Sequence, residues 1–487
     1  MAAAMACAVV PAFAAGTARA QQAPPQEPAT AADALPATGL EQPPATTGIT
    51  TSIPSGFLEG STSDFRRLLD AGQYEQATAL ARGLLEEAEQ QPGPGSEYLQ
   101  VALMNLALAQ YLGKDYTGAE ASYLRVVELV EASGRLTSPR LARAQAGLAT
   151  TYYAAKRYDL AVARYELAIA LVRRERGLFT EQQVPFLEKY ADSLVRVGRA
   201  EDAVRARRYI LRAIERSYGA GSLRYAEEFE SLGRWFTRIG AYDPARASLR
   251  NSIRIIEAAN GEDAAELIGP LTALADCARL QLLDPSYANA TAPDDQRQSL
   301  FHDTMPPVLP STSTNTIAGE GQSALERAVE IAGAQVPPTR VADVRALLGD
   351  WYLSRKKREE GLSNYRLAWQ AAGDATADGK PLKELLFGQP VLLAYSPPGS
   401  WDRYAARPAD EVAVHLATLD MTVTADGRVA DPKLVSDGGD PRFGEQLLRA
   451  AQAAIYRPRL EKGVPVATPG VTLEQPFYVL VEKEPGD

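Results

Sequence analysis

The sequence predicts an all-α solenoid of repeated helix pairs, followed by a small α+β domain. Three observations lead to this prediction. Alanines recur every 42 residues, at Ala77, Ala119, Ala161, Ala203 and Ala245. A large residue followed by a small one precedes each of the last four alanines by the same distance. Beyond Glu411 the helical spacing of apolar residues gives way to strand-like alternation. Because several positions keep one period, the first region is an internal repeat.

Within one repeat, the pattern predicts a helix, a short turn and a second helix. In the second repeat these helices are expected over residues 101–112 and 116–132. Small residues let the two helices approach closely, and large residues fill the space beside the contact. The residues expected to form this packing are Leu106, Ala107, Tyr116, Ala119, Leu148, Ala149, Tyr158, Ala161, Leu232, Gly233, Tyr242 and Ala245. Since one pair cannot bury its apolar face, stacked pairs should complete the core.

This pattern resembles the tetratricopeptide repeat (TPR) family, in the longer form found in kinesin light chains. The family's pair of a leucine and a small residue matches Leu106-Ala107, Leu148-Ala149 and Leu232-Gly233. Its turn matches the stretches Gly72 to Ala77, Asp115 to Ala119 and Gly240 to Ala245. The usual repeat has about 34 residues, so longer helices or loops are expected here. The resemblance implies a TPR superhelix and says nothing about chemistry.

The N-terminal stretch has the pattern of a secretory signal. Residues 2–15 are small and apolar, and Ala18-Arg19-Ala20 fits a small-x-small cleavage site. We therefore expect a signal peptide over residues 1–20 and a periplasmic protein of a Gram-negative bacterium. No Lys or Arg lies next to Met1. The alternative is therefore that the N-terminal segment is retained, or extended upstream, as an inner-membrane anchor.

Composition predicts the remaining boundaries. Residues 21–60 are rich in Pro, Ala, Thr and Gln, which is typical of a disordered leader. The repeats are expected over residues 61–375, with an irregular insertion over residues 285–321 inside the sixth repeat. Prolines interrupt residues 376–409, which are predicted to be a linker.

Residues 410–487 have the pattern of a β-β-α-β domain. Val412, Val414 and Leu416 alternate, and the alternation then changes phase near Thr418, which predicts either a bulge or two joined strand segments. Asp426-Gly427 is a strong hairpin signal. A helix should begin at Asp440-Pro441, and a last strand is expected over residues 471–481.

This stretch resembles the C-terminal domain of TonB-family energy transducers. The matching residues are Asp426, Gly427 and Val429 of the hairpin and the aromatic-Arg-Pro motif Tyr456, Arg457 and Pro458, where Pro458 is expected to end the helix. The resemblance implies that the domain holds a segment of a partner at a sheet edge. A typical transducer has a membrane helix and a Pro-rich spanning segment where this chain has a predicted signal and helical repeats.

The sequence shows no catalytic constellation. It has no Gly-rich phosphate loop, nucleophile elbow or zinc-binding His–Glu pair. Cys277 is expected to be a buried apolar residue, and His302 and His415 have no ligand-spaced partner. We therefore predict no enzyme activity, no metal and no cofactor. The net charge of −10 argues against a nucleic-acid partner.

These observations favour a periplasmic adaptor that binds proteins or peptides, with no small-molecule substrate. Tyr111, Tyr153 and Tyr352 are candidates for an aromatic partner groove, and core packing is an equally weighted alternative. The TonB-like domain would capture a segment of an outer-membrane protein. The alternative function is a membrane-anchored TonB-family transducer for outer-membrane transport, which would engage inner-membrane motor proteins.

Overall fold

The computed structural model describes residues 55–90, 97–284, 313–377, 379–398 and 412–481. They form two compact parts, one ending at Glu228 and the other beginning at Phe229. The predicted signal peptide and most of the leader lie outside the described residues. So do residues 285–312 of the predicted insertion.

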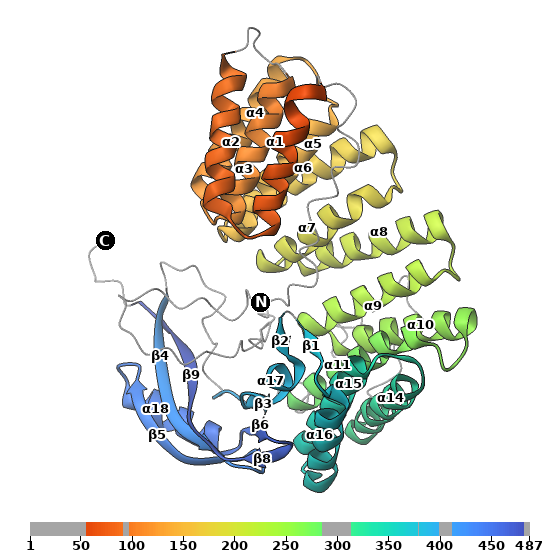
Figure 1. Cartoon of the computed structure of the whole chain (residues 1–487), viewed down its shortest axis with the longest axis vertical. Helices are drawn as coiled ribbons and strands as arrows, with labels where there is room; N and C mark the ends of the chain where they lie inside the picture. Colours follow the sequence, from red (N-terminus) through yellow and green to blue (C-terminus); the bar gives the residue numbers. More distant parts are fainter. Residues whose placement is uncertain (1–54, 91–96, 285–312, 378, 399–411, 482–487) are drawn as a thin grey trace, which may run out of the picture. The chain divides into compact units, whose positions relative to one another are not determined.

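Helix pairs make up the first compact part (Figure 1). The pairs are α1 (Ser55–Asp70) with α2 (Tyr74–Glu89), α3 (Glu97–Leu112) with α4 (Tyr116–Ala132), α5 (Pro139–Ala154) with α6 (Tyr158–Arg176), and α7 (Val184–Arg196) with α8 (Ala200–Tyr218). Two 3₁₀ turns, at Glu181–Gln183 and Ala265–Leu267, precede α7 and α11. Because α1 begins at Ser55, helical structure starts before the expected boundary at residue 61.

The second compact part continues the same architecture. Its pairs are α9 (Leu223–Arg238, across the boundary) with α10 (Tyr242–Asn260), α11 (Ile268–Leu283) with α14 (Thr314–Gln335), and α15 (Pro338–Ser354) with α16 (Arg358–Ala372). α14 begins inside the stretch predicted to be irregular. Its N-terminus is capped by Ser313, whose Oγ accepts from the backbone N–H of Thr316 at 3.3 Å.

The turn between the two helices of a repeat keeps one backbone conformation. A residue with positive φ occurs at Gly72, Lys114, Lys156, Gly198, Gly240 and Lys356. The N–H of the next residue reaches back to the first helix, for example from Arg157 to the Tyr152 carbonyl at 2.8 Å. This is the Schellman motif. Lysine adopts the left-handed conformation at a modest cost, so the turn persists where glycine is missing.

The residues predicted to pack the repeats lie at the helix contacts. Ala77, Ala119, Ala161, Ala203 and Ala245 are fully buried. Leu106, Ala107, Leu148, Ala149, Leu232 and Tyr242 are also buried, whereas Tyr116 and Tyr158 are half-buried. At Gly233 an added Cβ would lie 2.5 Å from Leu249 Cγ, so this contact has no room for a side chain.

A second set of glycines, separate from the predicted packing positions, ends the second helix of three repeats. Gly177, Gly219 and Gly261 are 42 residues apart, with φ of 87–93° and ψ of 154–170°. Only glycine occupies this conformation readily. The spacing of these glycines was a usable signal for the turn.

We expect Gly219→Ala to lower the free energy of unfolding by about 1–3 kcal/mol, because alanine is strained in this conformation. Gly221→Ala is the matched control. Gly221 lies in the same turn without a positive φ, and an added Cβ meets no atom within 4 Å. Its effect should stay within about 0.5 kcal/mol. Chemical denaturation measures the free energy of unfolding of both variants. Equal losses would contradict the conclusion that the backbone conformation at residue 219 requires glycine.

The predicted linker is partly folded. It contains β1 (Thr376–Ala377), β2 (Lys380–Pro381), α17 (Leu382–Phe387) and β3 (Val391–Ala394). β3 pairs antiparallel with β6 (Ile455–Arg457). Phe387 and Leu393 are buried in one cluster with Tyr365 of α16 and Leu460. The apolar residues between the prolines therefore complete a core shared by the last helix pair and the strands that follow.

The C-terminal region contains a three-stranded antiparallel sheet. Its strands are β5 (Val429–Asp437), β4 (Val412–Val423) and β9 (Thr468–Leu480), in that order. The helix α18 (Pro441–Gln452) packs against β5 and β4 (Figure 1). Alternate residues from Ala417 to Val423 are buried in the core below it. The register of β4 and β5 shifts between Thr418 and Leu419 within one continuous strand, so of the two predicted alternatives the structure has the bulge.

Short strands follow α18, contrary to one expectation. Pro458 does not end the helix, since α18 stops at Gln452 and Pro458 lies between β6 and β7 (Arg459–Glu461). The Tyr456 N–H instead donates to the Gly427 carbonyl at 2.8 Å. Pairing with the hairpin thus replaces continuation of the helix. β7 then pairs with β8 (Val464–Val466).

Candidate functional site

The arginine of the Tyr-Arg-Pro motif is buried against the last helix pair. Arg457 Nε donates to Asp350 Oδ1 at 2.8 Å, and its Nη2 donates to Oδ2 at 2.5 Å. Its Nη1 donates to the Leu386 carbonyl at 2.8 Å. The Tyr365 hydroxyl also donates to Asp350 Oδ1, at 2.8 Å. Burial alone would lower the pKa of Arg457, but Asp350 outweighs it and the pKa is raised.

The hairpin turn between β4 and β5 packs against Tyr456, the neighbour of Arg457, and against α15. Gly427 has φ of +78°, and an added Cβ would lie 2.1 Å from the Tyr456 carbonyl oxygen and 3.1 Å from Leu353 of α15. Asp426 Oδ2 lies 3.7 Å from Arg358 Nη1 of α16. A hydrogen bond from Thr424 lowers the pKa of Asp426, and Arg358 adds to this effect.

The structure therefore brings Asp426, Gly427, Tyr456 and Arg457 together, and Val429 packs against the sheet core. Their contacts join the C-terminal strands to α15 and α16. The buried motif residues Tyr456 and Arg457 therefore stabilise the fold.

The tyrosines proposed for a partner groove pack within the repeats. The Tyr111 ring is 6.1 Å from that of Tyr116, and the Tyr153 ring is 5.4 Å from that of Tyr158. Both pairs lie in the first compact part. Tyr352 lies in the second part, where its hydroxyl donates to Glu326 at 2.7 Å. Burial, reinforced by Glu326, raises the pKa of Tyr352 to about 12. Each of the three is half-buried.

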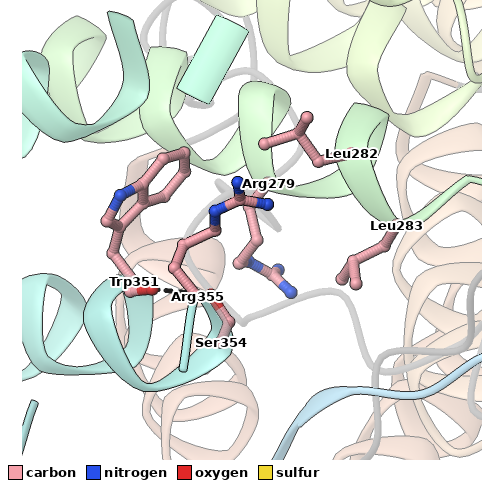
Figure 2. Close-up of a pocket in the computed structure, with 6 residues that line it drawn as sticks. All are labelled: Arg279, Leu282, Leu283, Trp351, Ser354 and Arg355. Carbon is pink, nitrogen blue, oxygen red and sulfur yellow. Dashed lines mark hydrogen bonds between the residues drawn. The ribbon is translucent and has the colours of Figure 1, made fainter. Parts of the chain in front are cut away.

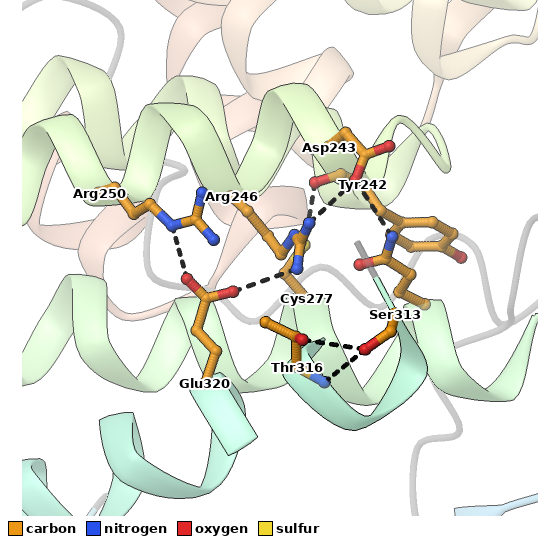
Figure 3. A network of polar contacts seen from close by, with 9 residues as sticks. Tyr242, Asp243, Arg246, Arg250, Cys277, Ser313, Thr316 and Glu320 are labelled. Atoms are coloured by element: carbon orange, nitrogen blue, oxygen red, sulfur yellow. Dashed lines mark hydrogen bonds and ion pairs between the residues drawn. The ribbon is translucent and has the colours of Figure 1, made fainter. Parts of the chain in front are cut away.

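A buried arginine joins two helices of the second part, α10 and α14 (Figure 3). Arg246 of α10 is 3% exposed and pairs with Asp243 at 3.1 Å and Glu320 of α14 at 3.2 Å. Arg250 pairs with the same Glu320 at 2.6 Å. Cys277 of α11 lies beside this network, and burial raises the pKa of its thiol to about 12. This supports the expectation of an unreactive cysteine. The sequence pattern gave no signal for the network.

A buried carboxyl group lies in the first compact part. Glu228 is 2% exposed, and its Oε1 is 3.8 Å from Nη2 of the buried Arg207. Arg207 also donates to Glu188 at 2.7 Å. Burial raises the pKa of Glu228 to about 7 and exceeds the opposing effect of Arg207. This residue therefore titrates near neutral pH.

The stability of the first part should depend on Glu228 between pH 5 and 7. An unfolded glutamate has a pKa near 4.5, below the folded value of about 7, so the folded state holds the proton more tightly in this window. The free energy of unfolding should fall by roughly 2–3 kcal/mol as the pH rises through it and then level off.

Denaturation at several pH values measures this effect. Glu228→Gln should remove most of the slope, because glutamine does not ionise. Glu227→Gln is the matched control, since Glu227 is adjacent and 67% exposed. An unchanged slope in Glu228→Gln would assign the titration to another group.

The described residues contain no group of three His, Cys, Asp or Glu side chains that could hold a metal. Within the same ranges, no helix is long and apolar enough to cross a membrane.

A family model of the tetratricopeptide repeat matches residues 98–174, which lie in α3 to α6. The chain contains tetratricopeptide repeats. No curated protein matches the sequence. The TPR region is of the kind that serves as a scaffold for protein–protein interaction.

Solved structures show similar helical repeats at low sequence identity. A kinesin-light-chain-like protein from Podosopora anserina is 17% identical, covering 42% of this chain and 96% of its own, with a TM-score of 0.38. A tetratricopeptide repeat protein from Parabacteroides merdae is 15% identical, covering 67% and 96%, with a TM-score of 0.35. A Rap protein complexed with Competence and Sporulation Factor is 12% identical, covering 64% and 96%, with a TM-score of 0.26.

Proposed function

We propose that this protein is a non-enzymatic adaptor whose TPR region binds proteins and whose C-terminal sheet captures an extended segment of another protein. The observation that carries the second role is the outer edge of β9. This strand has 13 residues and pairs with β4 on one side. No described strand pairs with its other side. A long open edge is a template for strand addition.

Pro476 indicates which backbone groups are available at this edge. It lies opposite Leu416 in an unbroken stretch of the β4–β9 register. Since proline has no N–H, this pair occupies a non-hydrogen-bonded position of the ladder. The backbone groups of Glu474 and Tyr478, two residues away on either side, then point to the open edge. Neighbouring Leu480 is 38% exposed, and Val414 opposite Tyr478 is 60% exposed.

The predicted signal peptide supports a periplasmic location for this adaptor. The resemblance to TonB C-terminal domains supports an outer-membrane protein as the source of the captured segment. The same resemblance favours a second candidate, a membrane-anchored energy transducer. N-terminal sequencing of the mature protein separates the two, because a chain that starts at Gln21 has no anchor in residues 1–20.

Site-specific crosslinking in cells tests the capture role. A photoreactive residue at exposed Thr472 should crosslink to a partner, and Glu474→Pro should abolish this product by removing an outward N–H. Glu474→Gln keeps the N–H and should leave the product unchanged. Partner products that survive in both variants would exclude strand addition at β9. Circular dichroism confirms that both variants are folded.

A further inference from the structure

An exposed leucine is held on the surface of the first compact part, where the loop between α6 and α7 packs on α8. The rings of Phe179 in this loop and Tyr209 in α8 are stacked, with their centroids 5.6 Å apart. The Tyr209 hydroxyl also donates to the Leu178 carbonyl, which ties the loop to the helix. These contacts give Leu178, which is 59% exposed, a defined position on the surface.

Three arginines lie over the same two rings. The guanidinium carbon of Arg216 is 4.0 Å from the Phe179 ring centroid. Those of Arg173 and Arg212 are 4.2 and 5.6 Å from the Tyr209 ring centroid. A cation–π contact orients a guanidinium by its face and leaves the N–H groups at its edge available as donors. We call this set the loop cluster; it consists of Arg173, Leu178, Phe179, Tyr209, Arg212 and Arg216.

The loop cluster is a basic site on an acidic chain. The two segments that build it, residues 173–181 and 208–218, hold six arginines and three glutamates, whereas the whole chain has a net charge of −10. Arg212 and Arg216 are exposed, and Arg173 is half-buried and donates its Nε to Gln183 at 2.9 Å. In the part of the chain that the structure describes, no carboxylate forms an ion pair with any of these three arginines.

The pocket between α11 and α15 in the second compact part is different (Figure 2). Its Arg279 already donates to Asp276 at 2.7 Å and to the Leu393 carbonyl at 2.9 Å. That arginine therefore has little left to offer a ligand. Arg212 and Arg216 of the loop cluster make no hydrogen bond among the described residues, so their donors remain open.

A second exposed leucine occupies the equivalent position of the preceding repeat. Leu136 is 42 residues before Leu178, also in the loop after the second helix of its repeat, and it is 57% exposed. Equivalent loops of neighbouring repeats lie along one edge of a solenoid, so both leucines meet solvent at the same edge. A single exposed leucine is ordinary. A repeated one beside unpaired cations indicates a binding surface.

We propose that this edge of the first compact part binds the surface of an anionic lipid membrane. Arg212 and Arg216 bind headgroup phosphates, for which a planar guanidinium supplies paired N–H donors. Leu136 and Leu178 enter the boundary between the headgroups and the acyl chains, as apolar side chains of interfacial proteins do. Membrane attachment is an activity separate from the strand capture proposed at β9.

A membrane fits these features better than an acidic peptide does. A lipid surface presents many phosphates in one plane with apolar material directly beneath them, so it meets the loops of two repeats at once. A peptide whose carboxylates bound Arg212 and Arg216 would not account for the exposed Leu136 one repeat away. The combination of spread cations and repeated leucines therefore favours the lipid surface.

Co-sedimentation of the full chain with lipid vesicles tests the proposal. We expect binding to vesicles that contain phosphatidylglycerol and phosphatidylcholine in equal parts, and little binding to phosphatidylcholine alone. Arg216→Gln should weaken binding about fivefold, the effect of one charge at an anionic surface. Arg196→Gln is the matched control and should bind as the wild type does. Exposed Arg196 also lies over a tyrosine ring, that of Tyr158, at the ends of α6 and α7 away from the loop.

Leu178→Ser tests the apolar half of the contact. It should weaken binding to the anionic vesicles about threefold or more, because less apolar surface leaves water. Leu160→Ser is its control and should have no effect, since Leu160 is 41% exposed near the start of α6, at the end of the helix far from the loop. Rising salt should weaken binding of the wild type, as expected for exposed charges.

Absence of binding to the anionic vesicles would overturn the proposal, as would equal binding by the wild type and Arg216→Gln. Arg216-dependent binding of inorganic phosphate without vesicle binding would assign the loop cluster to a free anion. Arg216-dependent binding of a hexaglutamate peptide, again without vesicle binding, would assign it to an acidic protein segment. None of these results affects capture at β9, because Glu474→Pro tests that edge separately.

Discussion

Asp350→Ala should lower the free energy of unfolding of the second compact part by about 3–5 kcal/mol. The substitution leaves the guanidinium of Arg457 buried without its carboxylate, and each of the two side chains is 10% exposed. The Tyr365 hydroxyl loses its acceptor as well. Chemical denaturation measures the loss, and hydrogen exchange should show faster exchange in β3 and β6, where Arg457 pairs with Val391.

A double variant separates the loss of a charge partner from the loss of packing. Asp350→Leu with Arg457→Met replaces both charges by apolar groups of similar size, which often costs little. We expect it to be more stable than Asp350→Ala. If the double variant is less stable than Asp350→Ala, the Asp350–Arg457 ion pair contributes more to the free energy of unfolding than apolar side chains of the same volume do.

Gly427→Val should destabilise the same region by about 2–4 kcal/mol, since strain at positive φ adds to overpacking. The added Cβ would overlap the Tyr456 carbonyl, which is backbone and cannot rotate away. Gly470→Val is the matched control. Gly470 has a similar φ of +72°, but an added Cβ there meets nothing within 4 Å.

The control separates the backbone strain at positive φ from the steric overlap with the Tyr456 carbonyl. Gly470→Val should cost roughly 1–2 kcal/mol, the part due to the backbone conformation. The remainder in Gly427→Val measures how tightly the hairpin packs on β6. If Gly427→Val and Gly470→Val lower the free energy of unfolding by the same amount, in both thermal and chemical denaturation, the contact between the hairpin and β6 relaxes without cost.

The helix pairs were predictable because their packing depends on periodic local signals. Ala119 lies three residues after Tyr116 and four after Asp115, and this spacing predicted the helix over Tyr116–Ala132 at its observed bounds. In the last repeat this signal failed. Arg358 replaces the usual tyrosine, and Gly361 the alanine. The structure shows the reason, since Arg358 faces Asp426 and Gly361 lies close to Gly349 and Leu353.

The contacts around Arg457 could not be predicted in the same way. They join residues 107 positions apart, Asp350 and Arg457, and no local pattern reports such a pairing. Pro381 and Pro390 favoured the prediction of a linker, because proline usually interrupts regular structure. Here they separate short elements whose apolar residues find partners on α16. Long-range burial therefore outweighed the local signal.

The shared core has a practical consequence for cutting this protein into fragments. A fragment that began at residue 410 would contain Arg457 but neither Asp350 nor Tyr365, and it would lack the strand β3 that pairs with β6. It would expose the apolar side of Leu460 to water. The smallest portable unit that keeps this core begins upstream of α15. Grafts and expression fragments of the C-terminal sheet should therefore include the last helix pair.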